Sequence, residues 1–167
     1  MFKTIAAIAG AAAVAAAVGG SALAMASSHP AASGTEHLQL MSTSATSSSS
    51  SLIAYGPAFT AAGTDHEGSG NVDTVTFANG TFKITHKLSG RGTQHFNPVT
   101  CQYVVTQNAT YKLSGGTGAY KGISGSGTAK LSILGIGARN SKGKCSQTKA
   151  PVAQHQLINA SGPASLP

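Results

Sequence analysis

The 167-residue sequence has little charge, few aromatic residues and no tryptophan. Charged residues make up 9% of the chain and aromatic residues 5%, and only four residues are acidic. With no tryptophan and few other aromatic side chains on which bases can stack, single-stranded nucleic acid is a poor candidate partner. We therefore expect no nucleic-acid partner. Beyond residue 36 no helical periodicity of Leu, Ala or Glu is present either, which indicates an all-β domain.

Motifs for a catalytic nucleophile, a nucleotide or a metal are also missing. No Gly-x-Ser-x-Gly sequence occurs, and Gly143 to Ser146 lacks the upstream glycine of a phosphate loop. The histidines lie at 29, 37, 66, 86, 95 and 155, without H-x-H or H-E-x-x-H spacing. We expect no metal and no cofactor.

The N-terminus has the three parts of a secretory signal. Lys3 precedes an uncharged apolar run, residues 5–18, and small residues bracket cleavage points near Ala24 and Ala26. This run is shorter than the roughly 20 apolar residues of a transmembrane helix. No basic stop-transfer cluster follows it, so a permanent membrane anchor is the weaker alternative. We expect an extracellular protein, released after cleavage.

The remainder is long enough for one domain. We predict a signal peptide at 1–26, a flexible Ser/Ala/Pro/Gly-rich leader at 27–36 and one domain at 37–167. The two cysteines, Cys101 and Cys145, lie in that domain and in an oxidising compartment most simply form a disulfide. The alternative is two free thiols, one of them a nucleophile.

The acidic residues all precede the bases of the mature part. Glu36, Asp65, Glu67 and Asp73 come before Lys83, and the whole chain has a net charge of +7. This asymmetry favours an anionic partner such as a cell-wall polymer. Alternatively, scattered lysines only keep the domain soluble.

Short strands separated by turn residues predict an antiparallel barrel, with a β-sandwich as the alternative. In residues 81–88 the even-numbered positions form an apolar face that includes His86, and Asn79-Gly80 is suited to a hairpin turn. The serine run 47–51 is expected to be a loop, and 140–144 a basic turn. The predicted strands are 38–44, 53–61, 71–77, 81–88, 103–113, 128–136 and 152–160.

The segment Gly115-Gly-Thr-Gly-Ala-Tyr-Lys-Gly-Ile-Ser-Gly-Ser-Gly127 resembles the glycine-rich hairpin of the allene oxide cyclase-like and dirigent-like barrel superfamily. With Phe96-Asn-Pro-Val-Thr-Cys101 and Gly143-Lys-Cys-Ser-Gln-Thr-Lys-Ala-Pro151, residues 37–167 resemble its uncharacterised secreted bacterial branch. The resemblance implies a single antiparallel eight-stranded barrel around an apolar cavity. Plant members cyclise an unsaturated fatty-acid epoxide or direct radical coupling of phenols, but none of their catalytic residues matches a position here.

Three residues are candidates to face a ligand in such a barrel. His86 shares the apolar face of its strand, so its imidazole could act as acid or base in the cavity. Tyr103 and Tyr111 share one face of the strand 103–113, and each offers an apolar ring with one hydroxyl. The alternatives are a satisfied histidine at the barrel mouth and core tyrosines.

Asp65-His66-Glu67 places three potential ligands side by side in the sequence. In an extended chain Asp65 and Glu67 share a face and His66 points away. A metal site would need further ligands from elsewhere, so we expect a solvated loop.

These observations leave three functional hypotheses. The first is a secreted, non-enzymatic binding or envelope-associated protein that holds a small apolar ligand. The second is an isomerase- or cyclase-like enzyme acting in an apolar cavity, which requires His86 to face that cavity with a second polar group within reach. The third is a structural or adhesive surface protein.

Overall fold

The computed structural model describes residues 31–44, 47–146 and 148–167. The predicted signal peptide, its cleavage points and residues 27–30 of the predicted leader lie outside the described residues. The strands are β1 (Ala32–Ser42), β2 (Ser49–Tyr55), β3 (Ala61–His66), β4 (Val72–Phe77), β5 (Gly80–Phe96), β6 (Gln102–Ser114), β7 (Ser124–Ile136) and β8 (Ala153–Leu166). Two short 3-10 turns, η1 (Ser69–Asn71) and η2 (Gly118–Tyr120), complete the elements.

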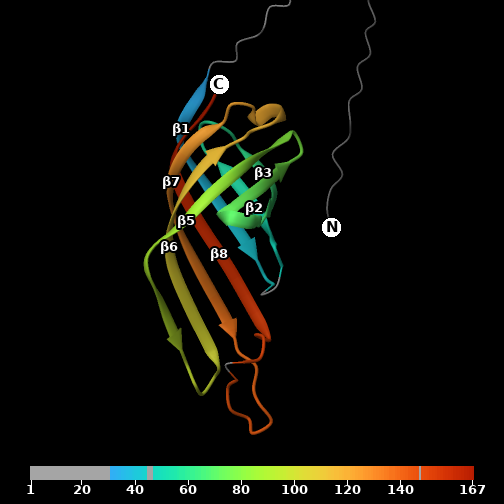
Figure 1. Ribbon diagram of the computed structural model, residues 1–167, viewed down its shortest axis with the longest axis vertical. Coiled ribbons are helices and arrows are strands. Elements are labelled where there is room, and N and C mark those ends of the chain that lie inside the picture. The colour runs from blue at the N-terminus through green and yellow to red at the C-terminus, as the bar shows by residue number, and fades with distance from the viewer. Residues whose placement is uncertain (1–30, 45–46, 147) are drawn as a thin grey trace, which may run out of the picture.

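Each strand pairs antiparallel with the next one in sequence, and β1 pairs with β8, so that the sheet closes into an eight-stranded barrel (Figure 1). The predicted antiparallel eight-stranded barrel is confirmed, and the sandwich alternative is wrong because the ring has no open edges. Among the described residues, no helix has the length and apolar character that crossing a membrane requires.

Three local predictions need correction. Ala32 to Glu36 belong to β1 and pair with β8, so this part of the predicted leader is barrel. The serine run is a loop only at its start, because β2 begins at Ser49. The predicted strand 53–61 is broken by a bend after Tyr55, and β3, which contains Asp65 and His66, replaces the solvated loop predicted there.

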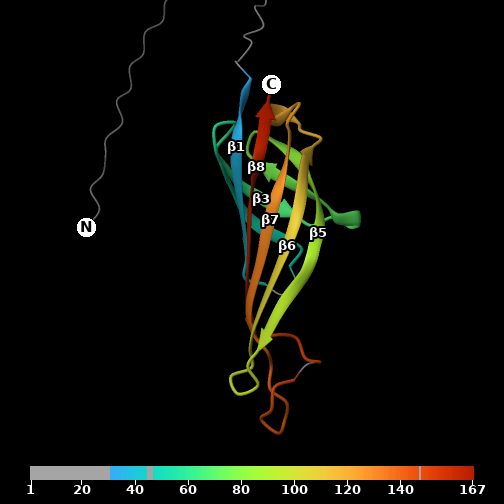
Figure 2. The ribbon, with the colours of Figure 1, turned by 90° about the vertical axis from the view of Figure 1, so that its left-hand side faces the viewer.

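The strands differ greatly in length. β2, β3 and β4 have only 7, 6 and 6 residues, whereas β5 has 17 and β8 has 14. The long strands therefore continue past the short ones as a ribbon that Figures 1 and 2 show running away from the C-terminus. We call residues 90–106 and 132–153 the extension. A register shift between Ser89 and Thr93 in the β5–β6 pairing marks where it departs from the barrel.

The tip of the extension is held by the predicted disulfide. Cys101 and Cys145 are bonded, with an S–S distance of 2.01 Å, which confirms the predicted pairing. Arg139 joins the same two loops, because its guanidinium donates hydrogen bonds to the carbonyl oxygens of Val99 and Gly143. The predicted turn at 140–144 is present: the Asn140 amide donates to the Lys144 carbonyl at 2.8 Å.

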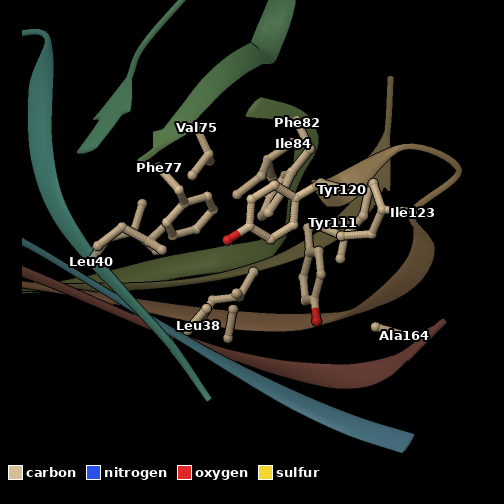
Figure 3. Packing of buried hydrophobic residues seen from close by; sticks show 14 residues of the cluster. Leu38, Leu40, Val75, Phe77, Phe82, Ile84, Tyr111, Tyr120, Ile123 and Ala164 are labelled. Carbon is tan, nitrogen blue, oxygen red and sulfur yellow. The ribbon is translucent and has the colours of Figure 1, made fainter. Parts of the chain in front are cut away.

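The opposite end of the barrel is filled with side chains and forms its closed end. The rings of Phe59, Phe77, Phe82 and Tyr120 have centroids 4.9–6.3 Å apart, with Tyr120 lying among Phe77, Phe82 and Tyr111 (Figure 3). Tyr120 and its buried neighbour Ile123 come from the glycine-rich segment, so this segment closes the barrel.

The glycines of that segment permit a close approach to the β4–β5 turn. The Ala119 amide donates to the Asn79 carbonyl at 2.9 Å, and Gly118 has a φ of +55°. A Cβ on Gly118 would lie 2.2 Å from the Asn79 carbonyl oxygen. Only glycine satisfies both the left-handed backbone and this contact.

Glu36 lies fully buried inside the closed end. Its Oε1 accepts hydrogen bonds from the Ala58 amide at 2.6 Å and the Phe59 amide at 3.3 Å. This carboxyl thereby holds the β2–β3 connection, which carries the Phe59 ring, against the barrel interior. Its role is structural at this end.

Candidate functional site

The end of the barrel that faces the extension contains a cavity of about 430 Å³. This volume lies in the usual range of small-molecule sites. The lining residues come from β1 to β8 and from the β1–β2 and β3–β4 connections: Leu38, Leu40, Ser42, Ser44, Ser47, Ser48, Ser50, Asp65, Glu67, Asn71, Asp73, Ile84, His86, Leu88, Ala109, Tyr111, Ala129, Leu131, Gln154, Gln156, Ile158 and Ala160.

The cavity has an apolar floor. Leu38 and Leu40 on β1, Ile84 on β5 and Ile158 on β8 form much of it, and the first three are buried. They lie on the same side of their strands as the core residues of the closed end, because every second side chain of a strand points inward. An apolar group of a ligand could pack against this floor without displacing any core side chain.

The rim of the cavity, in contrast to its floor, is mostly polar. On each of β1 to β4 the inward-facing residue nearest the open end is polar, and on β5 the polar His86 lies between the apolar Ile84 and Leu88. These rim residues are Ser42, Ser50, Asp65, Asp73 and His86. An amphipathic site results, with hydrogen-bonding groups above an apolar floor.

His86 pairs with Asp73 across the β4–β5 hairpin. Its Nε2 lies 3.2 Å from Asp73 Oδ2, and the other oxygen of Asp73 accepts a hydrogen bond of 3.4 Å from the Gly68 amide. His86 has a side-chain exposure of 30%, so it faces the cavity and remains accessible from it. Both oxygens of Asp73 therefore have partners, and the imidazole is held in one orientation.

Asp65 is a buried carboxyl at the rim of the cavity. It is 6% exposed, and its Oδ1 is buried with no hydrogen-bond partner. Burial, followed by the nearby charges of Asp73 and Glu67, raises the pKa of Asp65 from 3.8 to about 7. Near neutral pH this carboxyl can therefore take up or release a proton inside the cavity.

Tyr111 on β6 also lies on the cavity wall. Its hydroxyl is buried without a partner, and burial together with the charge of Glu36 raises its pKa. The ring belongs to the core cluster, so Tyr111 joins the two ends of the barrel.

Tyr103 lies elsewhere, in the extension. Its hydroxyl donates a 2.8 Å hydrogen bond to Gln154 Oε1, and its ring covers Gly135 on the neighbouring β7. Tyr103 and Tyr111 do share a strand face, as predicted, but β6 runs out of the barrel between them. Of the three predicted ligand-facing residues, His86 and Tyr111 line the cavity and Tyr103 does not.

The side chains of Asp65-His66-Glu67 point to two sides of the barrel wall, as the alternation of an extended chain predicts. Asp65 and Glu67 line the cavity, whereas the His66 ring contacts the Ser49 hydroxyl at 2.8 Å on the outer surface. Within the described part of the chain, no three His, Cys, Asp or Glu groups are arranged to hold a metal ion. Sequence reasoning missed Asp73, although its parity with Val75 and Phe77 in the predicted strand 71–77 places it inward.

No protein-family model, curated protein or solved structure gives a significant match to this chain. The geometry of the cavity is therefore the basis for a functional proposal.

Proposed function

We propose that this protein is an exported binding protein that holds a small, largely apolar molecule in the open end of its barrel. One observation carries the proposal: a cavity of about 430 Å³ is present at one end of a barrel whose other end is filled. A barrel of this size can otherwise be filled completely by its own side chains. The apolar floor and polar rim match the composition of small-molecule sites.

Export is the second part of the proposal. It is supported by the signal-like pattern of residues 1–26 and by the Cys101–Cys145 disulfide, which is compatible with an oxidising compartment. N-terminal sequencing of the protein recovered from culture medium tests it. A mature chain that starts just after Ala24 or Ala26 is expected, whereas an intact Met1 in the medium would contradict cleavage.

The binding proposal is tested by native mass spectrometry and solvent extraction of protein purified from its own host. We expect a bound small molecule in the native protein. Ala109 and Ala129 face each other across β6 and β7 and line the cavity, so the double variant Ala109→Leu/Ala129→Leu should fill it and lose that molecule. Thr110→Leu, which adds a similar group on the exposed side of β6, is the matched control and should keep it.

Two results would overturn the binding proposal. One is native protein that carries no molecule and binds none of a panel of apolar probes. The other is a cavity-filled double variant that retains the same molecule as the native protein, because that molecule would then sit elsewhere.

A second candidate is an isomerase- or cyclase-like enzyme, and a specific observation favours it. His86 faces the cavity with Asp73 at 3.2 Å, so the second polar group that this hypothesis requires is within reach. Such a pair can hold an imidazole in the orientation that proton transfer needs. Incubating the extracted molecule with native protein and with His86→Gln tests this candidate. Conversion by native protein alone supports an enzyme, and recovery of unchanged molecule from both leaves a binding protein.

A further inference from the structure

The charges of this protein are separated between its inside and its outside. The only four acidic residues of the chain are inside the barrel or at its rim: Glu36, Asp65 and Asp73 are buried, and Glu67 lines the cavity. Every lysine and arginine from Lys83 to Lys149 is exposed, and none lines the cavity. The protein is basic overall, yet the cavity rim carries three carboxyls and a single histidine.

These rim carboxyls are not equally satisfied. Asp73 has a partner on each oxygen, in Gly68 and His86. Asp65, by contrast, is more than nine-tenths buried and has an oxygen without any donor. A buried acceptor left without a donor is costly. If the Asp65 carboxyl turns so that this oxygen meets the cavity, a ligand donor can supply the hydrogen bond that the protein does not make.

The chemistry of the rim selects the kind of donor. Carboxylates bind cations with charge-assisted hydrogen bonds, and a cavity walled by low-dielectric groups focuses this attraction. A bare metal ion is a poor fit, because no three His, Cys, Asp or Glu groups in the described residues are arranged as its ligands. An ammonium group has N–H donors for Asp65 and can be attached to an apolar body that covers Leu38, Leu40 and Ile84.

We propose that the cavity binds amphipathic amines, with the ammonium group at the rim carboxyls Asp65, Asp73 and Glu67 and the apolar body on the floor. This inference rests on the proposed binding function and names the chemical class of its ligand. An anionic amphiphile of the same shape is disfavoured, because its head group would meet three carboxyls and no lysine or arginine within the cavity.

A proton should leave the cavity when the amine enters. Asp65 has its pKa raised to about 7, and the titratable groups that face it are Glu67 after β3, Asp73 on β4, His86 on β5 and Tyr111 on β6. An ammonium beside Asp65 favours its charged form, so binding at pH 7 releases part of a proton. Calorimetry in two buffers of different ionisation enthalpy measures this release.

The experiment compares three probes with the same tail: n-octylammonium, 1-octanol and octanoate. Isothermal titration of the purified protein at pH 8 should show octylammonium binding about tenfold or more tightly than octanol, and octanoate binding most weakly. Asp65→Asn should bring the affinities for octylammonium and octanol close together. Glu67→Gln, at an exposed rim position that cannot disturb the core, should reduce the preference part of the way.

Thr76→Lys is the matched control. It changes the net charge by the same amount as the acid-to-amide variants, but on the exposed side of β4, and should leave the preference for octylammonium unchanged. Octanol or octanoate binding as tightly as octylammonium would overturn the amine inference while leaving the binding function intact. Failure of all three probes would overturn both. A preference that survives in both Asp65→Asn and Glu67→Gln would remove the rim carboxyls as its cause.

Discussion

The closed and open ends of the barrel are built on the same strands but are filled in different ways. From the open end to the closed end, β4 places Asp73, Val75 and Phe77 inward. β5 does the same in reverse order along the chain, with Phe82 and Ile84 buried below His86. Strand alternation fixes which residues point inward, and their size and polarity then decide whether an end is packed or open. A barrel can in this way combine a stable core with a site whose polar groups are incompletely paired.

Phe82→Ala should produce the largest loss of stability and would test whether the closed end supports the fold. Phe82 is fully buried among the aromatic rings, so its truncation is expected to lower the free energy of unfolding by about 3–5 kcal/mol. Leu88→Ala on the same strand, at 62% exposure by the open end, should cost no more than about 0.5 kcal/mol. Urea unfolding measures both, and equal losses would contradict the division into two ends.

Asp65→Asn should produce the next largest change in stability, and this change depends on pH. The pKa of Asp65 is raised from 3.8 to about 7 in the folded protein, so folding takes up a proton between these values and stability falls as the pH rises from about 4 to about 7. The total loss is up to about 4 kcal/mol. Asp65→Asn should remove it, which makes the variant more stable than the parent at pH 8, less so at pH 5, and nearly equal to it only below about pH 4. Thermal unfolding across this range provides the check, and identical pH profiles would refute the effect.

Glu36→Ala tests the carboxyl of the closed end. The variant leaves the buried amides of Ala58 and Phe59 without their acceptor, at an expected cost of about 2–3 kcal/mol. Gln39→Ala, at an exposed position on β1, is the control and should stay within about 0.5 kcal/mol of the parent. If Glu36→Ala were neutral, the carboxyl would not hold the β2–β3 connection.

His86→Gln should have the smallest effect on stability. The pair with Asp73 lies at a partly exposed rim, where such pairs contribute about 0.2–1 kcal/mol. The difference between parent and variant should shrink further in high salt, because exposed charges are screened. A loss above about 2 kcal/mol would mean that the open end, too, supports the fold.

Sequence alone predicted the barrel and the disulfide but only part of the cavity. The alternation around Phe82 correctly placed His86 on the inward face. Asp65 could not be found in this way, because β3 reads Ala-Ala-Gly-Thr-Asp and has no apolar alternation. The reason is spatial: a Cβ on Gly63 would lie 2.6 Å from the Phe77 ring, so β3 leaves its interior space to a side chain of β4.

Tyr103 shows a different limit of sequence reasoning. Its side of β6 was correct, yet its distance along the barrel was not, because the short lengths of β2, β3 and β4 decide where the barrel ends. Those lengths depend on turns such as the bend after Tyr55, where Gly56-Pro57 is a turn signal that the predicted strand 53–61 ignored. The strand face on which a residue lies is thus a local property, whereas its position along the barrel axis depends on the lengths of the other strands.

The pairing of β1 with β8 sets the order in which this protein can assemble. All other pairings join consecutive strands, but this one joins Ala32 to Leu166 and closes the ring. A growing chain can form hairpins early, yet it cannot enclose the cavity until β8 has been synthesised, since long-range pairing comes after the local pairing. The interior therefore first exists when folding is complete. A ligand can therefore enter this cavity no earlier than the pairing of β8 with β1.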